Sequence, residues 1–202
     1  MSIGTHDSLQ PASRGVGPLL QREYWAVIAG CRVRPSALLD ALSERFWAFA
    51  PSDVVSFTRA DGTTSPLERG DILEVLIRGA GTSRVCVVER SAQTLTLATM
   101  LGHPEAGRIT FGAYRNPYGD VIFHVRSRAR SSSRSRYAGF LMIGEAMQTA
   151  TWVDFVIAVA RTFGDGVVGY VNAETTRFRG RSAAEAEASA SSEPATFLAE
   201  GD

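Results

Sequence analysis

The sequence contains no lysine: all 21 of its basic residues are arginine, and its acidic residues also number 21. The formal net charge at neutral pH is therefore zero. A chain without net positive charge has no overall attraction for nucleic acid or for an anionic membrane surface. We therefore expect neither a nucleic acid nor a membrane to be its main partner.

Cysteine and histidine are also scarce, with 2 and 3 residues. Cys31 and Cys86 stand among apolar residues, which is typical of small buried side chains rather than of a disulfide, and favours a reducing compartment. No cysteine or histidine pair has the spacing of a zinc site, and signatures of a phosphate-binding loop or a serine nucleophile are lacking. We expect no bound metal and no cofactor.

Long apolar segments are missing too. No uncharged apolar run reaches the roughly 18 residues that span a bilayer, and residues 1–15 lack the charged start and apolar core of an export signal. With 202 residues, of which 45% are hydrophobic, the chain is long enough for one globular domain. We expect a cytoplasmic protein with a single domain.

Both ends differ in composition from the middle of the chain. Residues 1–17 are rich in Ser, Gly and Pro, and residues 180–202 form a low-complexity Ala/Ser/Glu segment. We expect a flexible N-terminal segment over 1–17, a folded domain over 18–175 and a disordered tail over 180–202.

The apolar residues of the middle part change period along the chain. A short apolar run predicts a buried strand over 22–30, and helical spacing between Pro35 and Pro51 predicts one amphipathic helix. Alternation between 54 and 130, interrupted by turn residues, predicts five or six antiparallel strands. Residues 137–163 contain no proline and predict the longest helix. The fold class is α+β.

The stretch RSRARSSSRSRY, residues 126–137, combines five arginines with five serines. Arg126, Arg128 and Arg130 alternate with the apolar side chains of the preceding strand, so they are predicted to lie on its solvent side. The serines that follow can cap the long helix, and we favour a plain strand-to-helix connection. Two alternatives stay open: an anion site beside the helix N-terminus, and an RNA contact through 126–136.

The long helix carries one acid that its periodicity turns toward the sheet. Glu145 shares an arc with Gln148, Thr149 and Trp152, opposite the water-facing side. A carboxylate in that position must be paired, protonated or in a wet cavity, because its unpaired burial costs several kcal/mol. Glu145 is therefore either a structural partner of an inward arginine such as Arg115, or a general acid or ligand anchor.

The segment TMLGHPE, residues 99–105, concentrates polar chemistry at the end of a strand. Thr99 continues an inward apolar face, and the turn at GHP places His103 and Glu105 beside each other. A histidine and a carboxylate at a strand end can share a proton in acid/base chemistry. In the structural alternative, His103 satisfies turn carbonyls while Glu105 pairs with Arg108.

Several stretches of the sequence resemble a known superfamily, with the GHPE turn as their most specific part. They are GPLLQREYW, PLERGDILEVLIRG, CVVERSAQTLTLATMLGHPEAGRITF and GDVIFHVRSRAR. Over residues 17–172 the chain resembles a bacterial and plant family, labelled only as a domain of unknown function, within the START-like (SRPBCC) superfamily. The resemblance implies a helix-grip fold, in which a curved antiparallel sheet wraps around one long C-terminal helix. Arg108 and Ile109 stand where the family has an acidic pair, so a role tied to those carboxylates is not carried over.

The same resemblance implies a deep apolar cavity between the sheet and the long helix. Superfamily members bind lipids, hormones or polyketides there, and some close or dehydrate polyketide rings. Predicted ligand-binding residues, beyond the acid/base candidates Glu145, His103 and Glu105, are Thr99, Phe111, Phe123, Val125, Arg126, Thr149 and Trp152. The apolar members of this set would equally describe a filled core.

Two functions follow as hypotheses. In the first, the protein is a polyketide cyclase- or dehydratase-like enzyme that holds a small hydrophobic molecule, with Glu145 or His103 as proton donor. In the second, it is a non-catalytic carrier or sensor of such a molecule. The sequence leaves open whether the protein is an enzyme, and a homodimer is compatible with it.

Overall fold

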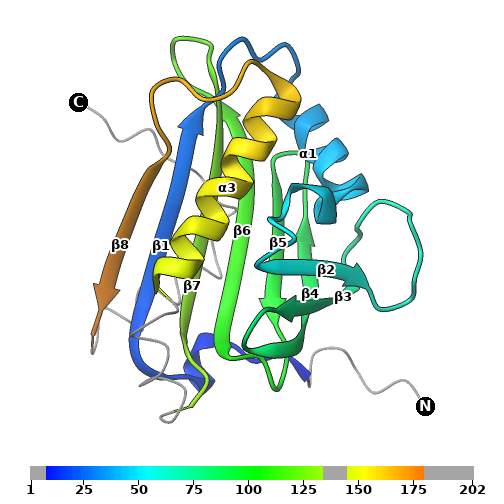
Figure 1. Ribbon diagram of the computed structural model, residues 1–202, viewed down its shortest axis with the longest axis vertical. Coiled ribbons are helices and arrows are strands. Elements are labelled where there is room, and N and C mark those ends of the chain that lie inside the picture. Colours follow the sequence, from blue (N-terminus) through cyan, green and yellow to red (C-terminus); the bar gives the residue numbers. More distant parts are fainter. Residues whose placement is uncertain (1–7, 134–144, 180–202) are drawn as a thin grey trace.

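The computed structural model describes residues 8–133 and 145–179, in which an eight-stranded antiparallel sheet curves around the helix α3 (Figure 1). The order of strands across the sheet is β2-β3-β4-β5-β6-β7-β1-β8. The strands are β1 (Val16–Val27), β2 (Val55–Arg59), β3 (Ile72–Ile77), β4 (Gly81–Arg90), β5 (Thr94–Thr99), β6 (Glu105–Arg115), β7 (Val121–Ser131) and β8 (Asn172–Phe178). The helical elements are η2 (Ala12–Arg14), α1 (Pro35–Glu44), η3 (Phe46–Phe49) and α3 (Glu145–Phe163).

This arrangement confirms the predicted fold class and the predicted run of antiparallel strands between residues 54 and 130, where β2 to β7 follow one another as neighbours. The helix predicted after Pro35 is divided into α1 and the short η3. Helix α3 ends at Phe163, as predicted. Of its predicted span 137–163, residues 137–144 lie outside the described part of the chain.

Strand β8 is not predicted by the sequence, and it extends the sheet beyond the expected domain end at residue 175. It pairs with β1 at one edge of the sheet, and most of its side chains are exposed. A strand with little burial on either face has no reason to alternate between apolar and polar residues. Its sequence, NAETTRF, therefore carries no period-two signal.

Part of the N-terminal segment that was expected to be flexible packs against the sheet. The backbone N–H of Gln10 donates to the Thr99 carbonyl at 2.8 Å, and Ala12 is buried. Strand β1 then begins at Val16. Residues 1–7 and the predicted tail 180–202 lie outside the described residues.

Phenylalanines fill one half of the space between the sheet and α3. The Phe155 ring of α3 lies 5.1 Å from that of Phe111, 5.4 Å from that of Phe46 and 6.3 Å from that of Phe123, measured between centroids. All four side chains are fully buried, and such ring pairs add about 0.5–1.5 kcal/mol each to the burial of apolar area. We call this group, together with Phe49 of η3, the aromatic half.

None of the helices in the described residues is both long and apolar enough to cross a membrane.

Candidate functional site

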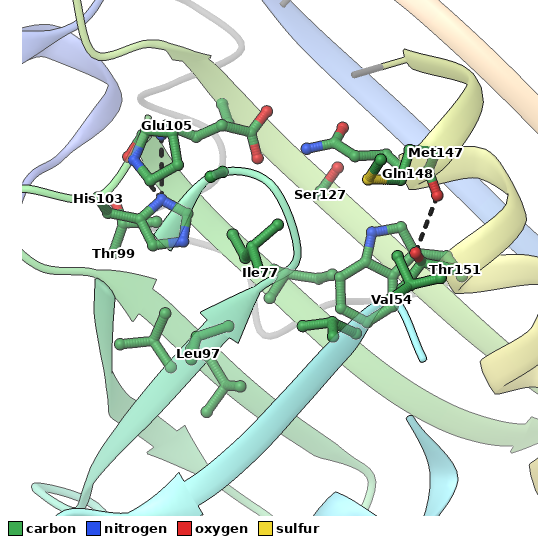
Figure 2. A pocket seen from close by; sticks show the side chains of 18 of the residues that line it. Val54, Ile77, Leu97, Thr99, His103, Glu105, Ser127, Met147, Gln148 and Thr151 are labelled. Carbon is green, nitrogen blue, oxygen red and sulfur yellow. Dashed lines mark hydrogen bonds between the residues drawn. The ribbon is translucent and has the colours of Figure 1, made fainter. Parts of the chain in front are cut away.

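The other half of the space between sheet and helix is a cavity of about 620 Å³. It lies where β6 begins and β7 ends, beneath the first described turns of α3, and we call this part the open half. Figure 2 shows apolar side chains such as Ile77 and Leu97 on one side of it and polar groups on the other. The lining residues are Val54, Val55, Phe57, Val75, Ile77, Arg78, Gly79, Ala80, Val85, Leu97, Thr99, His103, Pro104, Glu105, Arg108, Ile109, Ser127, Ala129, Met147, Gln148, Thr151 and Trp152.

The cavity exists because the side chains become smaller along two neighbouring strands. On the face of β6 toward α3, Phe111 is followed by Ile109 in the direction of the cavity, and on β7 Phe123 gives way to Ser127 and Ala129. The helix keeps the same sheet beneath it over this distance. Space that phenylalanine rings fill in the aromatic half is therefore left empty in the open half.

A buried ion pair forms the polar end of the cavity. The Nη1 atom of Arg22 lies 3.3 Å from Oε1 of Glu105, and the two side chains are 1% and 15% exposed. Arg22 lies on β1 opposite Ser127 of β7, on the face that turns toward the helix. Removing one partner of such a pair would leave an uncompensated buried charge, so each side chain fixes the position of the other.

Arg22 was missed from the sequence because it lies between the polar residues Gln21 and Glu23 of β1. The alternation of β1 carries the signal: Leu20 and Tyr24, two positions away on either side, are buried on the same face. An arginine between two inward apolar residues must find a buried acceptor, which points to a partner carboxylate. The sequence alone does not say which carboxylate that is.

The turn that carries His103 and Glu105 is held rigidly. The backbone N–H of Glu105 donates to Nδ1 of His103 at 3.0 Å. Nε2 of Gln10 donates to the carbonyls of both residues, at 3.0 Å for His103 and 2.8 Å for Glu105. Nδ1 of His103 also lies 3.1 Å from the Glu105 carbonyl oxygen, so the tautomer of the ring decides whether this nitrogen donates or accepts. The two residues lie together at the strand end, and the carboxylate pairs with Arg22 rather than with Arg108.

Thr99 lines the cavity, but its hydroxyl is engaged by the protein itself. It donates to the Gln10 carbonyl at 2.9 Å and accepts the N–H of Gly107 at 2.9 Å. Gly107 allows this close packing, because a Cβ there would lie 2.2 Å from the carbonyl oxygen of Arg128. Thr99 therefore holds the N-terminal segment and the start of β6 against each other.

Helix α3 contributes Met147, Gln148, Thr151 and Trp152 to the lining, whereas Thr149 is half-buried outside it. The Thr151 hydroxyl donates to the Met147 carbonyl at 2.8 Å, as drawn in Figure 2. The Trp152 ring contacts Phe111 at a centroid distance of 5.7 Å, so it forms the wall between the open and aromatic halves.

The side chain of Glu145, the first residue of α3, lies outside the described part of the chain. Its suggested partner Arg115 is exposed at the far end of β6 and donates to the Gly119 carbonyl.

Three of the predicted ligand-binding residues lie in the filled core instead of the cavity wall. Phe111, Phe123 and Val125 are fully buried and do not line the cavity. Their inward direction follows from the alternation of β6 and β7, as expected. The period of a strand specifies a face, however, and not the volume left in front of it.

The arginines of β7 lie on the face of the sheet opposite the cavity. Arg126 pairs with Glu23, and Nε of Arg128 donates to the Gln21 side chain at 2.6 Å. On this same face, burial first and the charge of Arg126 second lower the pKa of His124 to about 3. The structure thus does not bring Arg126 to the cavity. Residues 134–136 of the Arg/Ser stretch lie outside the described chain.

Two other arginines do border the cavity. Arg78 follows β3 and is exposed, and Arg108 lies on β6; both belong to the lining. Within residues 8–133 and 145–179, no group of three or more His, Cys, Asp or Glu side chains could hold a metal ion.

The sequence matches no protein-family model and no curated protein sequence. The structure, in contrast, is similar to several solved ones. The di-domain ARO/CYC StfQ from the steffimycin biosynthetic pathway matches with a TM-score of 0.50 and 10% identity, over 76% of this chain and 52% of that one. This chain therefore spans about half the length of the di-domain protein.

Two further solved structures match most of their own length. The KanY protein has a TM-score of 0.52 and 10% identity, over 70% of this chain and 94% of that one. A norcoclaurine synthase point mutant from Thalictrum flavum, in complex with a transition-state analogue, has a TM-score of 0.51 and 8% identity, over 73% and 96%. These likenesses confirm the predicted helix-grip fold.

Proposed function

We propose that the protein binds a small, mostly apolar molecule in the open half. The observation that carries this proposal is the cavity of about 620 Å³, with largely apolar walls and one ion-paired carboxylate at its polar end. Small-molecule sites are typically concave, about 300–1,000 Å³ in volume, and apolar with a few convergent polar groups. A guest there would remove its apolar surface from water while its polar end meets Glu105.

A catalytic form of this function has support from two observations. The turn places an imidazole and a carboxylate at the cavity wall, and two proteins of similar fold are named ARO/CYC and norcoclaurine synthase. Glu105 would accept a proton from the guest, and the protonated imidazole of His103 would donate one to a carbonyl or leaving oxygen. The reaction class is then a cyclisation or dehydration by acid/base chemistry. Glu145 stays a further candidate donor.

A carrier or sensor remains the second candidate, and the buried Arg22 favours it. A carboxylate held against a guanidinium is a fixed hydrogen-bond acceptor, which suits the anchoring of a ligand. Binding is common to both forms, so it is tested first. The difference between them is whether the bound molecule leaves the protein chemically changed.

The experiment is native mass spectrometry of the protein purified from its own host. We expect a co-purifying small molecule that is lost in Ala129→Leu, because the larger side chain enters the cavity, and retained in the control Ala60→Leu in an exposed turn. The dye 1-anilinonaphthalene-8-sulfonate should show the same contrast. If neither a host molecule nor the dye distinguishes the two variants, the binding function is wrong.

Turnover separates the enzyme from the carrier. The released molecule, or its precursor from the host extract, is incubated with wild type, Glu105→Gln and Glu145→Gln. An enzyme would lose turnover in at least one variant that still binds, whereas a carrier would change affinity alone.

A further inference from the structure

The geometry points to a hydroxyl group as the feature that the polar end of the cavity selects: an alcohol or phenol oxygen bound among Glu105, Ser127 and Gln148. This inference rests on the proposed function and names the chemical class of its ligand. It is carried by three polar side chains from β6, β7 and α3 that line the same cavity. Figure 2 shows their polar ends directed to the same part of it.

Glu105 supplies a fixed acceptor. Its Oε1 atom accepts from Nη1 of Arg22, and the described residues provide no hydrogen-bond partner for Oε2. In Figure 2 the carboxylate extends from its strand into the cavity. Because Arg22 is almost completely buried behind it, a guest meets the carboxylate and not the guanidinium. Arg22 is thus a positioning residue.

Ser127 and Gln148 supply the complementary donors. Ser127 is the β7 partner of Arg22 in the β1–β7 register, which places its hydroxyl beside the ion pair. The Gln148 amide reaches from α3 toward the carboxylate (Figure 2). Neither side chain has a hydrogen bond to any other residue in the described ranges. Both groups are therefore available to a guest, and a guest that covers them without forming a hydrogen bond would incur the cost of their desolvation.

A hydroxyl is the group that satisfies this set with the fewest atoms. It donates to Oε2 of Glu105 and accepts from the Ser127 hydroxyl or the Gln148 amide. A ligand carboxylate has no proton to donate, so two acceptors would face each other at Oε2 of Glu105. A ligand ammonium gains little, because Arg22 already neutralises the acid. An ether accepts hydrogen bonds but leaves Oε2 without a donor, so it should bind more weakly than the matching alcohol.

The test compares 2-naphthol with 2-methoxynaphthalene by isothermal titration calorimetry; 2-naphthalenemethanol and 2-naphthoate serve as the alcohol and carboxylate arms. We expect wild type to bind 2-naphthol about tenfold more tightly than its methyl ether, as for a hydrogen bond to a charged group. The alcohol 2-naphthalenemethanol should also bind more tightly than the ether. The carboxylate 2-naphthoate should bind most weakly of the four compounds. If 2-naphthalenemethanol binds more tightly than 2-naphthol, the site selects aliphatic hydroxyls. If 2-naphthol binds more tightly, the site selects phenols.

Variants locate the preference. Ser127→Ala and Gln148→Leu should each weaken the binding of naphthol and of its ether at least threefold, because the oxygen of either compound accepts from these donors; the loss is on the order of one neutral hydrogen bond. The controls Ser52→Ala and Gln93→Leu, at exposed positions outside the cavity lining, should leave both affinities unchanged. Arg22→Met/Glu105→Met removes both charges together, which avoids stranding one of them, and should bring the naphthol-to-ether affinity ratio close to one.

The outcomes separate this inference from the proposed function. Selection of a hydroxyl is wrong, while the cavity still binds, if wild type binds naphthol and ether equally or if Arg22→Met/Glu105→Met keeps the full ratio. It is also wrong if Ser127→Ala and Gln148→Leu weaken the binding of neither compound. If none of the four compounds binds, or if Ala129→Leu leaves their binding unchanged, the proposed function fails first.

Discussion

The aromatic half and the open half are built from the same strands and the same helix, yet one is a core and the other a cavity. Phe111 and Phe123 fill the space beneath α3 at one end, and Ile109, Ser127 and Ala129 leave it open at the other. The helix-grip fold thus provides a volume between sheet and helix. The size of the inward side chains then decides whether the protein or a guest occupies that volume.

The aromatic half contributes stability, whereas the open half contributes the binding site. A cavity loses the contacts that its missing atoms would have made, so it must be supported by well-packed structure nearby. The interlocked phenylalanine rings of α3, η3, β6 and β7 supply that support. Side chains of the open half are correspondingly free to serve recognition.

The largest expected contrast comes from truncating one residue in each half of α3. Phe155→Ala should lower the free energy of unfolding by about 3–5 kcal/mol, since a fully buried phenylalanine leaves a large void. Met147→Ala, at the cavity wall, should cost less than about 1 kcal/mol. Urea unfolding followed by circular dichroism measures both. Equal losses in the two variants would mean that the open half is packed like the aromatic half.

The ion pair at the polar end gives the next largest effect. Glu105→Gln keeps the shape of the side chain but leaves the buried guanidinium of Arg22 uncompensated, which should destabilise by about 3 kcal/mol or more. Arg22→Met/Glu105→Met should cost clearly less than Glu105→Gln alone. Urea unfolding of Arg22→Met, Glu105→Met and the double variant completes the cycle. Additive losses would contradict a coupled pair.

The pH dependence of stability probes the sheet behind the aromatic half. His124 has its pKa lowered to about 3 by burial and by Arg126, so the folded state binds no proton at this site between its unfolded pKa of about 6.5 and pH 3. The unfolded chain does bind a proton there. The free energy of unfolding should therefore fall by up to about 1.4 kcal/mol for each unit by which the pH is lowered over that interval.

His124→Phe should remove this contribution, because phenylalanine keeps an aromatic contact with Trp25 and does not titrate. The measurement is urea unfolding of both proteins at pH 7, 6, 5 and 4. Parallel curves for wild type and variant would show that His124 is accessible to protons in the folded protein.

The smallest contrast comes from enlarging an alanine in each half. Ala113→Leu adds atoms to the aromatic half, where the fully buried site has no room, and should cost about 1–3 kcal/mol. Ala129→Leu extends into the cavity and should change stability by less than about 1 kcal/mol. Thermal unfolding monitored by calorimetry compares them. A larger loss for Ala129→Leu would argue against a persistent cavity.

Much of the fold could be predicted from local patterns, and the cavity only in part. Alternation and turn residues indicate β2 to β7, and helical spacing indicates α3, because each element buries one face. Three residues that were expected at the site do line the cavity: His103, Glu105 and Trp152.

The remainder depends on contacts distant in sequence. Arg22 and Glu105 meet only when β1 and β6 lie on either side of β7, which no local pattern specifies. Phe111 and Val125 were expected at the site because inward residues of a core and of a cavity share the same period. To distinguish a core residue from a cavity residue, one must know how much space lies in front of its side chain. That space is set by the helix and the strand together.

Anomalous diffraction from crystals grown with 6-bromo-2-naphthol shows whether the open half admits a guest and the aromatic half does not. We predict one bromine peak on the apolar side of the cavity, near Ile77 and Leu97, with the hydroxyl oxygen at Glu105. A cavity collapsed around its own side chains, or a bromine peak only outside it, would contradict the account.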